Sequence, residues 1–194
     1  MFLPILQKAD SNDFKNFIQF WSKLYYYPSE LENHYAETIS KEIFDESDIQ
    51  RLFLWKNRMT LSIKKQICLE KKVKSKLDLI NFMKSNDEWQ ISYFIENFDN
   101  LTAVWEFFLL HIIKPKKYPI YDQHVHRAFN FINGLSIIGI SANTITNKEK
   151  KEFYLNKYLP FISNLNGHNL KTVDEALFAF GQFLRTNRNA LLLM

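Results

Sequence analysis

Apolar side chains recur along almost the whole chain at the three- and four-residue spacing of an amphipathic helix. The alternation typical of a strand is not sustained anywhere, and the chain holds only 4 Gly and 5 Pro. These are too few for the closely spaced turns of a β-sandwich or barrel. With 194 residues and no shift in composition along the chain, the sequence predicts an all-α protein with a single helical domain over residues 1–194.

The apolar stripes also predict where the helices lie. A first helix carries Phe14, Phe17, Ile18, Trp21 and Leu24. Asp45 is placed to cap the helix that it begins, because its side chain can accept a hydrogen bond from the backbone of the first turn. Further helices are predicted over residues 29–44, 45–58, 62–84 (as one or two helices), 87–98, 101–114, 122–132, 147–165 (with a bend at Pro160) and 172–185.

Composition narrows the chemistry that is expected. A single cysteine, Cys68, excludes a disulfide framework, a cysteine-ligated zinc site and a four-cysteine iron–sulfur cluster, and it predicts a cytoplasmic protein. The glycine spacings of a nucleotide-binding loop do not occur, and no cofactor is expected. No apolar run of about 18 residues is present, so no membrane span is expected. The net charge of +4 is compatible with nucleic-acid binding.

The most informative stretch runs from Leu101 to Arg127. A predicted helix ends at Pro115, a short linker follows, and a second helix begins at Asp122. As an N-cap, the Asp122 carboxylate would accept hydrogen bonds from backbone N–H groups of the first turn. The positive end of the helix would also favour a carboxylate at this position. Capping alone is one interpretation of this residue.

The segment Pro119-Ile120-Tyr121-Asp122-Gln123-His124-Val125-His126-Arg127 gives a second interpretation. It resembles the V-D-x-H-V-x-R-like segment that follows the hairpin in the helix-hairpin-helix DNA glycosylase superfamily. Upstream, residues 95–103 (IENFDNLTA) lie where the hairpin L-P-G-V-G-x-K-T-A of that family would fall, and residues 173–181 resemble its carboxy-terminal element. The resemblance centres on residues 85–135. It implies the fold of that family, double-stranded DNA as partner, and Asp122 as the catalytic carboxylate.

The sequence departs from the family pattern at the hairpin. Asn97 and Asp99 stand where the family has glycines, and Leu101 stands where some members have a lysine that forms a Schiff base. The resemblance therefore implies a monofunctional enzyme that hydrolyses the N-glycosidic bond of a damaged or unusual base. A single carboxylate suits this reaction, because it can stabilise the positive charge that develops on the sugar and activate a water molecule.

The resemblance also implies roles for the neighbouring side chains. An extruded base must be held in a pocket, and the candidates for binding it are Trp105, Tyr118, Tyr121, His124 and His126; the three aromatic residues have a core position as the alternative. The candidates for contacting DNA are Asn97, Asp99, Asn100, Lys114, Lys116, Lys117 and Arg127. Glu106 is either a second polar group of the pocket or a solvated charge. No metal site is expected, because His124 and His126 are two apart on a helix and point in different directions.

A run of six lysines, opposed by Glu70 alone, is the strongest basic feature: Lys64, Lys65, Lys71, Lys72, Lys74 and Lys76. It is either a solvated helix face or a surface that contacts phosphates. A second function stays open beside the glycosylase, namely a non-catalytic helical module that binds DNA or another protein on the same scaffold. The missing glycines and lysine favour that alternative.

Overall fold

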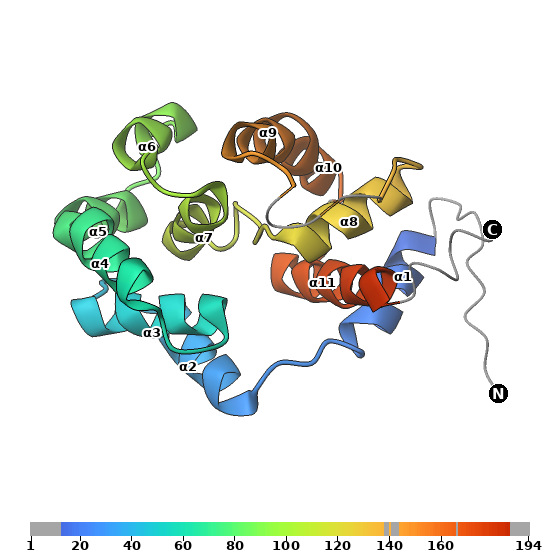
Figure 1. The fold of residues 1–194 in the computed structure, drawn as a ribbon, viewed down its shortest axis with the longest axis horizontal. Helices are drawn as coiled ribbons and strands as arrows, with labels where there is room; N and C mark the ends of the chain where they lie inside the picture. The colour runs from blue at the N-terminus through green and yellow to red at the C-terminus, as the bar shows by residue number, and fades with distance from the viewer. Residues whose placement is uncertain (1–12, 138–139, 141–143, 166, 187–194) are drawn as a thin grey trace. The chain divides into compact units, whose positions relative to one another are not determined.

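The structure is a computed structural model that describes residues 13–137, 140, 144–165 and 167–186. Every regular element in these ranges is a helix, which confirms the all-α prediction (Figure 1). The chain forms two compact units. Unit 1 holds residues 1–26, 123–140 and 167–194, and unit 2 holds residues 27–122 and 141–166. No helix in the described ranges is long and apolar enough to cross a membrane.

Unit 1 is built from α1 (Asp13–Ser22), α8 (Gln123–Ile132) and α11 (Leu170–Thr186). Helix α11 packs against both of the others. Its Phe180 ring contacts Trp21 of α1, at 4.8 Å between ring centroids, and Phe131 of α8, at 5.5 Å. Each such aromatic pair contributes about 0.5–1.5 kcal/mol beyond the area that it buries. An aromatic cluster therefore holds this unit together.

Helices α8 and α11 come unusually close at Gly181. A Cβ atom at this position would lie 2.0 Å from the backbone oxygen of His124, so only glycine fits. The buried guanidinium of Arg127 on α8 reinforces the contact. It donates hydrogen bonds to the carbonyl oxygens of Gly181, at 3.1 Å, and of Ile140, at 2.6 Å. The residues on α8 are thus fixed against α11 through backbone atoms.

Unit 2 surrounds one central helix, α7 (Ala103–Ile113), in which every residue except Val104 is buried. Helix α7 packs against α5, α6 and α9, while α2 pairs with α3. The other elements of the unit are α2 (Ser29–Ile39), α3 (Glu46–Asn57), α4 (Ile63–Lys72), the 3₁₀-helix η1 (Lys74–Lys76), α5 (Leu77–Ser85), α6 (Ile91–Phe98), α9 (Asn147–Phe153), the π-helix η2 (Tyr154–Tyr158) and α10 (Leu159–Ser163).

Local sequence explains several helix boundaries. Asp45 caps α3 as predicted: its side chain accepts from the Asp48 backbone N–H at 2.9 Å, and the Asp48 side chain accepts in return from the Asp45 N–H. The π-helix η2 leads into Pro160 in the first turn of α10, where the missing N–H cannot continue the ladder of α-helical hydrogen bonds. The helix predicted over 147–165 is thus observed as α9, η2 and α10 in direct succession.

Several predicted helices differ in length from the observed ones; the helix predicted over 87–98, for example, is α6, which begins at Ile91. The predicted helix over 62–84 is α4 and α5 with η1 between them. The predicted helix over 29–44 ends at Ile39, because Phe44 is held elsewhere: the Asn81 side chain accepts from its backbone N–H at 2.8 Å and donates to its carbonyl oxygen at 2.9 Å. Part of the irregular stretch over 134–146 lies outside the described residues.

Candidate functional site

A tight turn joins α6 and α7 at the position of the expected hairpin. Helix α6 ends at Phe98, and the Leu101 N–H donates to the Phe98 carbonyl oxygen at 3.1 Å. Asp99 has right-handed helical dihedral angles, φ −58° and ψ −22°. Arg58 is the one residue other than glycine with a positive φ in the part of the chain that the structure describes. The turn therefore closes without a left-handed residue, which explains how it forms without glycine.

Asp122 is half-buried at the end of unit 2, in the non-helical segment 119–122 that immediately precedes α8. The phenols of Tyr27 and Tyr121 lie within reach of its charge. Burial is the main reason why the pKa values of both phenols are raised. The negative charge of Asp122 raises these pKa values further. The charge of Asp122 therefore acts on two tyrosines that stay protonated at neutral pH.

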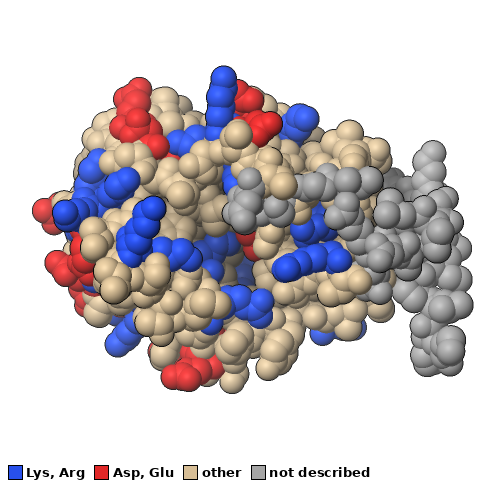
Figure 2. All heavy atoms as spheres, viewed as in Figure 1, with Lys and Arg blue, Asp and Glu red and all other residues tan. Residues whose placement is uncertain are grey.

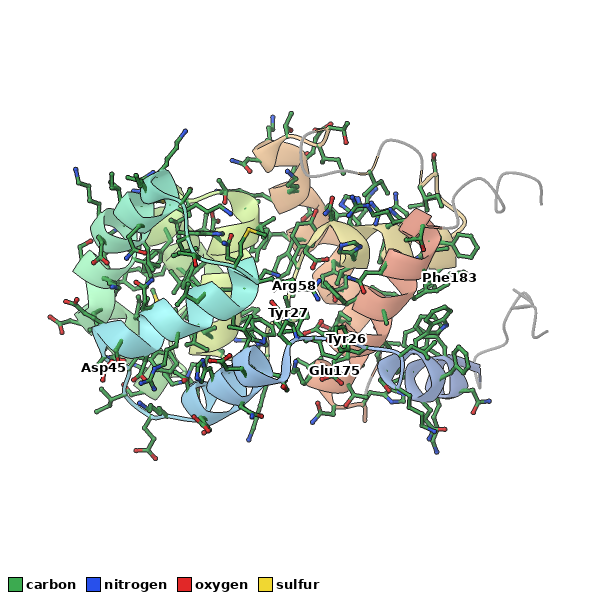
Figure 3. All side chains as sticks on the ribbon, turned by 60° about the horizontal axis from the view of Figure 1, so that its bottom comes forward. Tyr26, Tyr27, Asp45, Arg58, Glu175 and Phe183 are labelled. Carbon is green, nitrogen blue, oxygen red and sulfur yellow. The ribbon has the colours of Figure 1, made fainter. Side chains whose placement is uncertain are left out.

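The carboxyl end of α3 supplies the other groups near residues 121 and 122. The Arg58 guanidinium lies 4.6 Å from the centre of the Tyr27 ring, and Figure 3 shows these two side chains next to each other. The Tyr27 hydroxyl donates to the Trp55 carbonyl oxygen. The Lys56 ammonium donates to the Tyr121 carbonyl oxygen at 3.2 Å. Nothing in the sequence points to residues 55–58, because 65 positions separate Lys56 from Tyr121.

The three aromatic residues predicted to bind a base are all buried in unit 2. The exposed fractions are 8% for Trp105, 5% for Tyr118 and 1% for Tyr121. Their rings contact those of core neighbours, as Trp105 does with Phe53 at 4.8 Å between centroids. These are core environments, and contact with an extruded base stays a prediction for all three. Tyr27 is more exposed than any of them.

The histidines occupy separate environments. His111 is buried in unit 2 between the Tyr35 hydroxyl, 2.6 Å from Nε2, and the Tyr118 carbonyl oxygen, 2.7 Å from Nδ1. Because a carbonyl only accepts, Nδ1 carries the proton and Nε2 accepts from Tyr35. His124 and His126 are buried on α8 in unit 1. No group of histidine, cysteine or acidic side chains among the described residues is arranged to hold a metal ion.

The basic residues predicted to contact DNA divide into two groups. Arg127 is buried in unit 1, where its guanidinium donates to Gly181 and Ile140. Lys114 is half-buried in unit 2 and forms an ion pair with Asp87, at 2.5 Å between Nζ and Oδ1. Lys116 and Lys117 are exposed. Of these four side chains, the last two are therefore the most accessible to a ligand.

Glu106 is fully buried on α7, so the interpretation as a solvated charge is wrong. Its Oε2 pairs with the Lys151 ammonium at 2.6 Å. Oε1 has no hydrogen-bond partner among the described residues. Burial raises the pKa of Glu106 in spite of the adjacent lysine. This carboxyl group belongs to the interior of unit 2.

The described residues thus define an all-helical protein in which two helices joined by a tight turn precede a half-buried carboxylate among aromatic side chains. Comparison with protein-family models, with curated proteins and with solved structures gave no match. The function is therefore argued from the residues themselves.

Proposed function

We propose that the protein is a monofunctional DNA glycosylase, which removes a damaged or unusual base by hydrolysing its N-glycosidic bond with Asp122 as the catalytic carboxylate. The observation that carries the proposal is the half-buried position of Asp122, next to Tyr121 in the chain and with its charge acting on Tyr27, in the segment that follows the α6–α7 turn and α7. This order of elements is the one that the resemblance to helix-hairpin-helix glycosylases implies.

The environment of Asp122 suits the chemistry of bond cleavage. The C1′–N bond breaks with development of positive charge on the sugar, and a fixed carboxylate nearby stabilises that charge. The same carboxylate can accept a proton from the water molecule that attacks C1′. The base leaves with the electron pair of the broken bond. The protonated phenols of Tyr27 and Tyr121 add no negative charge that would repel a phosphate or a departing base.

The absence of lyase chemistry is part of the proposal. A lyase needs an amine that attacks C1′ and forms a Schiff base. Leu101, at the position where the resembling family carries its lysine, is a buried apolar residue with 3% of its surface exposed. The product is therefore an abasic site in an unbroken strand.

The test is base release from duplexes that carry uracil, an alkylated purine or oxidised guanine, with hot alkali to reveal abasic sites. Asp122→Asn should lose at least about 100-fold in single-turnover rate, because it removes the charge that stabilises the transition state. Its affinity for DNA should change little. Asp78→Asn is the matched control, since it makes the same chemical change at an exposed carboxylate on α5.

Four results would contradict the proposal. Equal activity of wild type and Asp122→Asn would remove Asp122 from the mechanism. Strand cleavage without alkali would show a lyase that uses another amine, with Lys56 as the first to replace because it contacts Tyr121. Binding to all duplexes without release of a base would favour the non-catalytic DNA-binding module, and absence of binding would favour a protein-interaction module.

A further inference from the structure

Three lysine side chains from outside the α6–α7 turn converge on its backbone. Lys72, at the end of α4, donates to the Asn100 carbonyl oxygen at 2.7 Å. Lys76, at the end of η1, donates to the Asn97 carbonyl oxygen. Lys151 of α9 donates to the Asp99 carbonyl oxygen at 3.3 Å. The turn thus carries three ammonium groups.

Two of these ammonium groups have no counter-ion among the described residues. Lys151 contacts the Glu106 carboxyl group at 2.6 Å, and the neighbouring Lys74 contacts Glu70 at 2.7 Å. No carboxylate among the described residues pairs with Lys72 or Lys76. An ammonium has three N–H donors, so each of the two keeps donors beyond the one that a carbonyl takes.

Holding a lysine in one geometry has a cost, because this side chain loses about 1.5–2 kcal/mol of conformational entropy when it is fixed. A solvated lysine avoids that cost. Lys72 and Lys76 are half-buried and bound to carbonyl oxygens, whereas Lys64 and Lys71 of the same lysine run are exposed. Figure 2 shows several basic side chains over the α4–α5 part of the face in view, and others spread over the rest of that face. The two ammonium groups are thus held at the turn, each with N–H donors beyond the one that its carbonyl oxygen accepts.

We infer that Lys72 and Lys76 form a two-lysine phosphate clamp at the α6–α7 turn, which binds the backbone of duplex DNA. The inference rests on the proposed function for the identity of its ligand. In this clamp, lysine side chains supply the donors for phosphate at a turn that has no glycine. Asp99 is exposed on the same turn and opposes binding, because its charge repels a phosphate.

The first test uses the wild-type protein and an undamaged duplex of random sequence. Lysines are acetylated briefly at low salt with and without the duplex, and the modified positions are read by mass spectrometry. Lys72 and Lys76 should be protected at least about fivefold more than Lys64 and Lys71, since a bound phosphate covers their remaining donors. Equal protection of all four lysines, or none, would overturn the clamp.

The second test measures affinity against salt concentration for Lys72→Gln/Lys76→Gln. Each lost phosphate contact lowers the slope of log K against log salt by about 0.9, so the slope should fall by about 2. Lys64→Gln/Lys71→Gln removes the same charge from the same run and should leave the slope within about 0.5 of wild type. Lys72→Arg/Lys76→Arg should retain the wild-type slope. Asp99→Asn should bind DNA more tightly.

The clamp and the glycosylase proposal fail in different ways. Base release with a wild-type salt slope in Lys72→Gln/Lys76→Gln would overturn the clamp and leave the enzyme assignment standing. Loss of binding in that variant alone, in a protein that releases no base, would establish the clamp on a non-catalytic DNA-binding module. An identical loss in the Lys64→Gln/Lys71→Gln control would show a general effect of charge and overturn the clamp.

Discussion

Burial of the Glu106 carboxyl group inside unit 2 affects both its pKa and the stability of the protein. Removing a carboxylate from water is costly unless its partners compensate, and here one ammonium contacts one of the two oxygens. Burial outweighs the attraction to Lys151, so the pKa of Glu106 is raised above its ordinary value of 4.5. The neutral form is the one that the interior of unit 2 favours.

This raised pKa predicts how stability depends on pH. In the unfolded chain Glu106 ionises near pH 4.5, whereas in the folded protein it resists ionisation until a higher pH. Its contribution to stability is therefore complete below pH 4.5 and is lost as the pH rises through the folded pKa. Glu106→Gln should therefore lose less stability than wild type between pH 4.5 and pH 7.5. The measurement is the free energy of unfolding in urea at these two pH values. Glu152→Gln, at an exposed side chain, should keep the wild-type dependence. Parallel falls in wild type and Glu106→Gln would contradict the assignment.

The packing of helix α8 against helix α11 depends on Gly181, which has no side chain. Gly181 lets the backbone of α11 meet the backbone of α8 at His124, and Arg127 donates across the same contact. A methyl group at this point would meet backbone atoms, which cannot rotate away as the end of a side chain can. Either the helices separate or the unit loses its packing.

Gly181→Ala should therefore destabilise the protein by about 3 kcal/mol, the upper part of the range for overpacking, even though alanine favours helix more than glycine does. Urea denaturation followed by circular dichroism measures the change. Gln182→Ala, at the next position of α11, should stay within about 0.5 kcal/mol of wild type. An unchanged midpoint in Gly181→Ala would show that α8 and α11 do not approach as closely as described.

A helix boundary can be predicted from the sequence when the residues that fix it are close together in the chain, and not when they are far apart. The start of α3 is predictable because Asp45 and Asp48 cap it within one turn. The end of α2 is not, because the Asn81 side chain that holds Phe44 lies 37 positions away. The same limit applies to the candidate site. Asp122 stands in a recognisable local segment, but Lys56 reaches Tyr121 only through the packing of unit 2.

At the scale of the whole molecule, each of the two units has its own aromatic core. Phe180 is central to that of unit 1, while unit 2 stacks Phe107 on Tyr154 at 3.8 Å between ring centroids. The sequence predicts abundant core aromatics from composition alone, with 18 Phe among its residues. Their division between two units is not predictable, because unit 1 draws on three separate stretches of the chain.

The burial of α7 has a consequence for the exchange of amide hydrogens with solvent. No face of α7 is open to water, so its backbone N–H groups should exchange only when unit 2 opens as a whole. In α4, where Leu69 is the one buried residue, exchange should proceed through local opening. Hydrogen–deuterium exchange with mass spectrometry should find the α7 amides the slowest of unit 2, with a rate that rises steeply in mild denaturant. Equal rates in α7 and α4 would contradict this. If the α7 amides are the slowest, their exchange reports the free energy of unfolding of unit 2, the unit that contains Asp122.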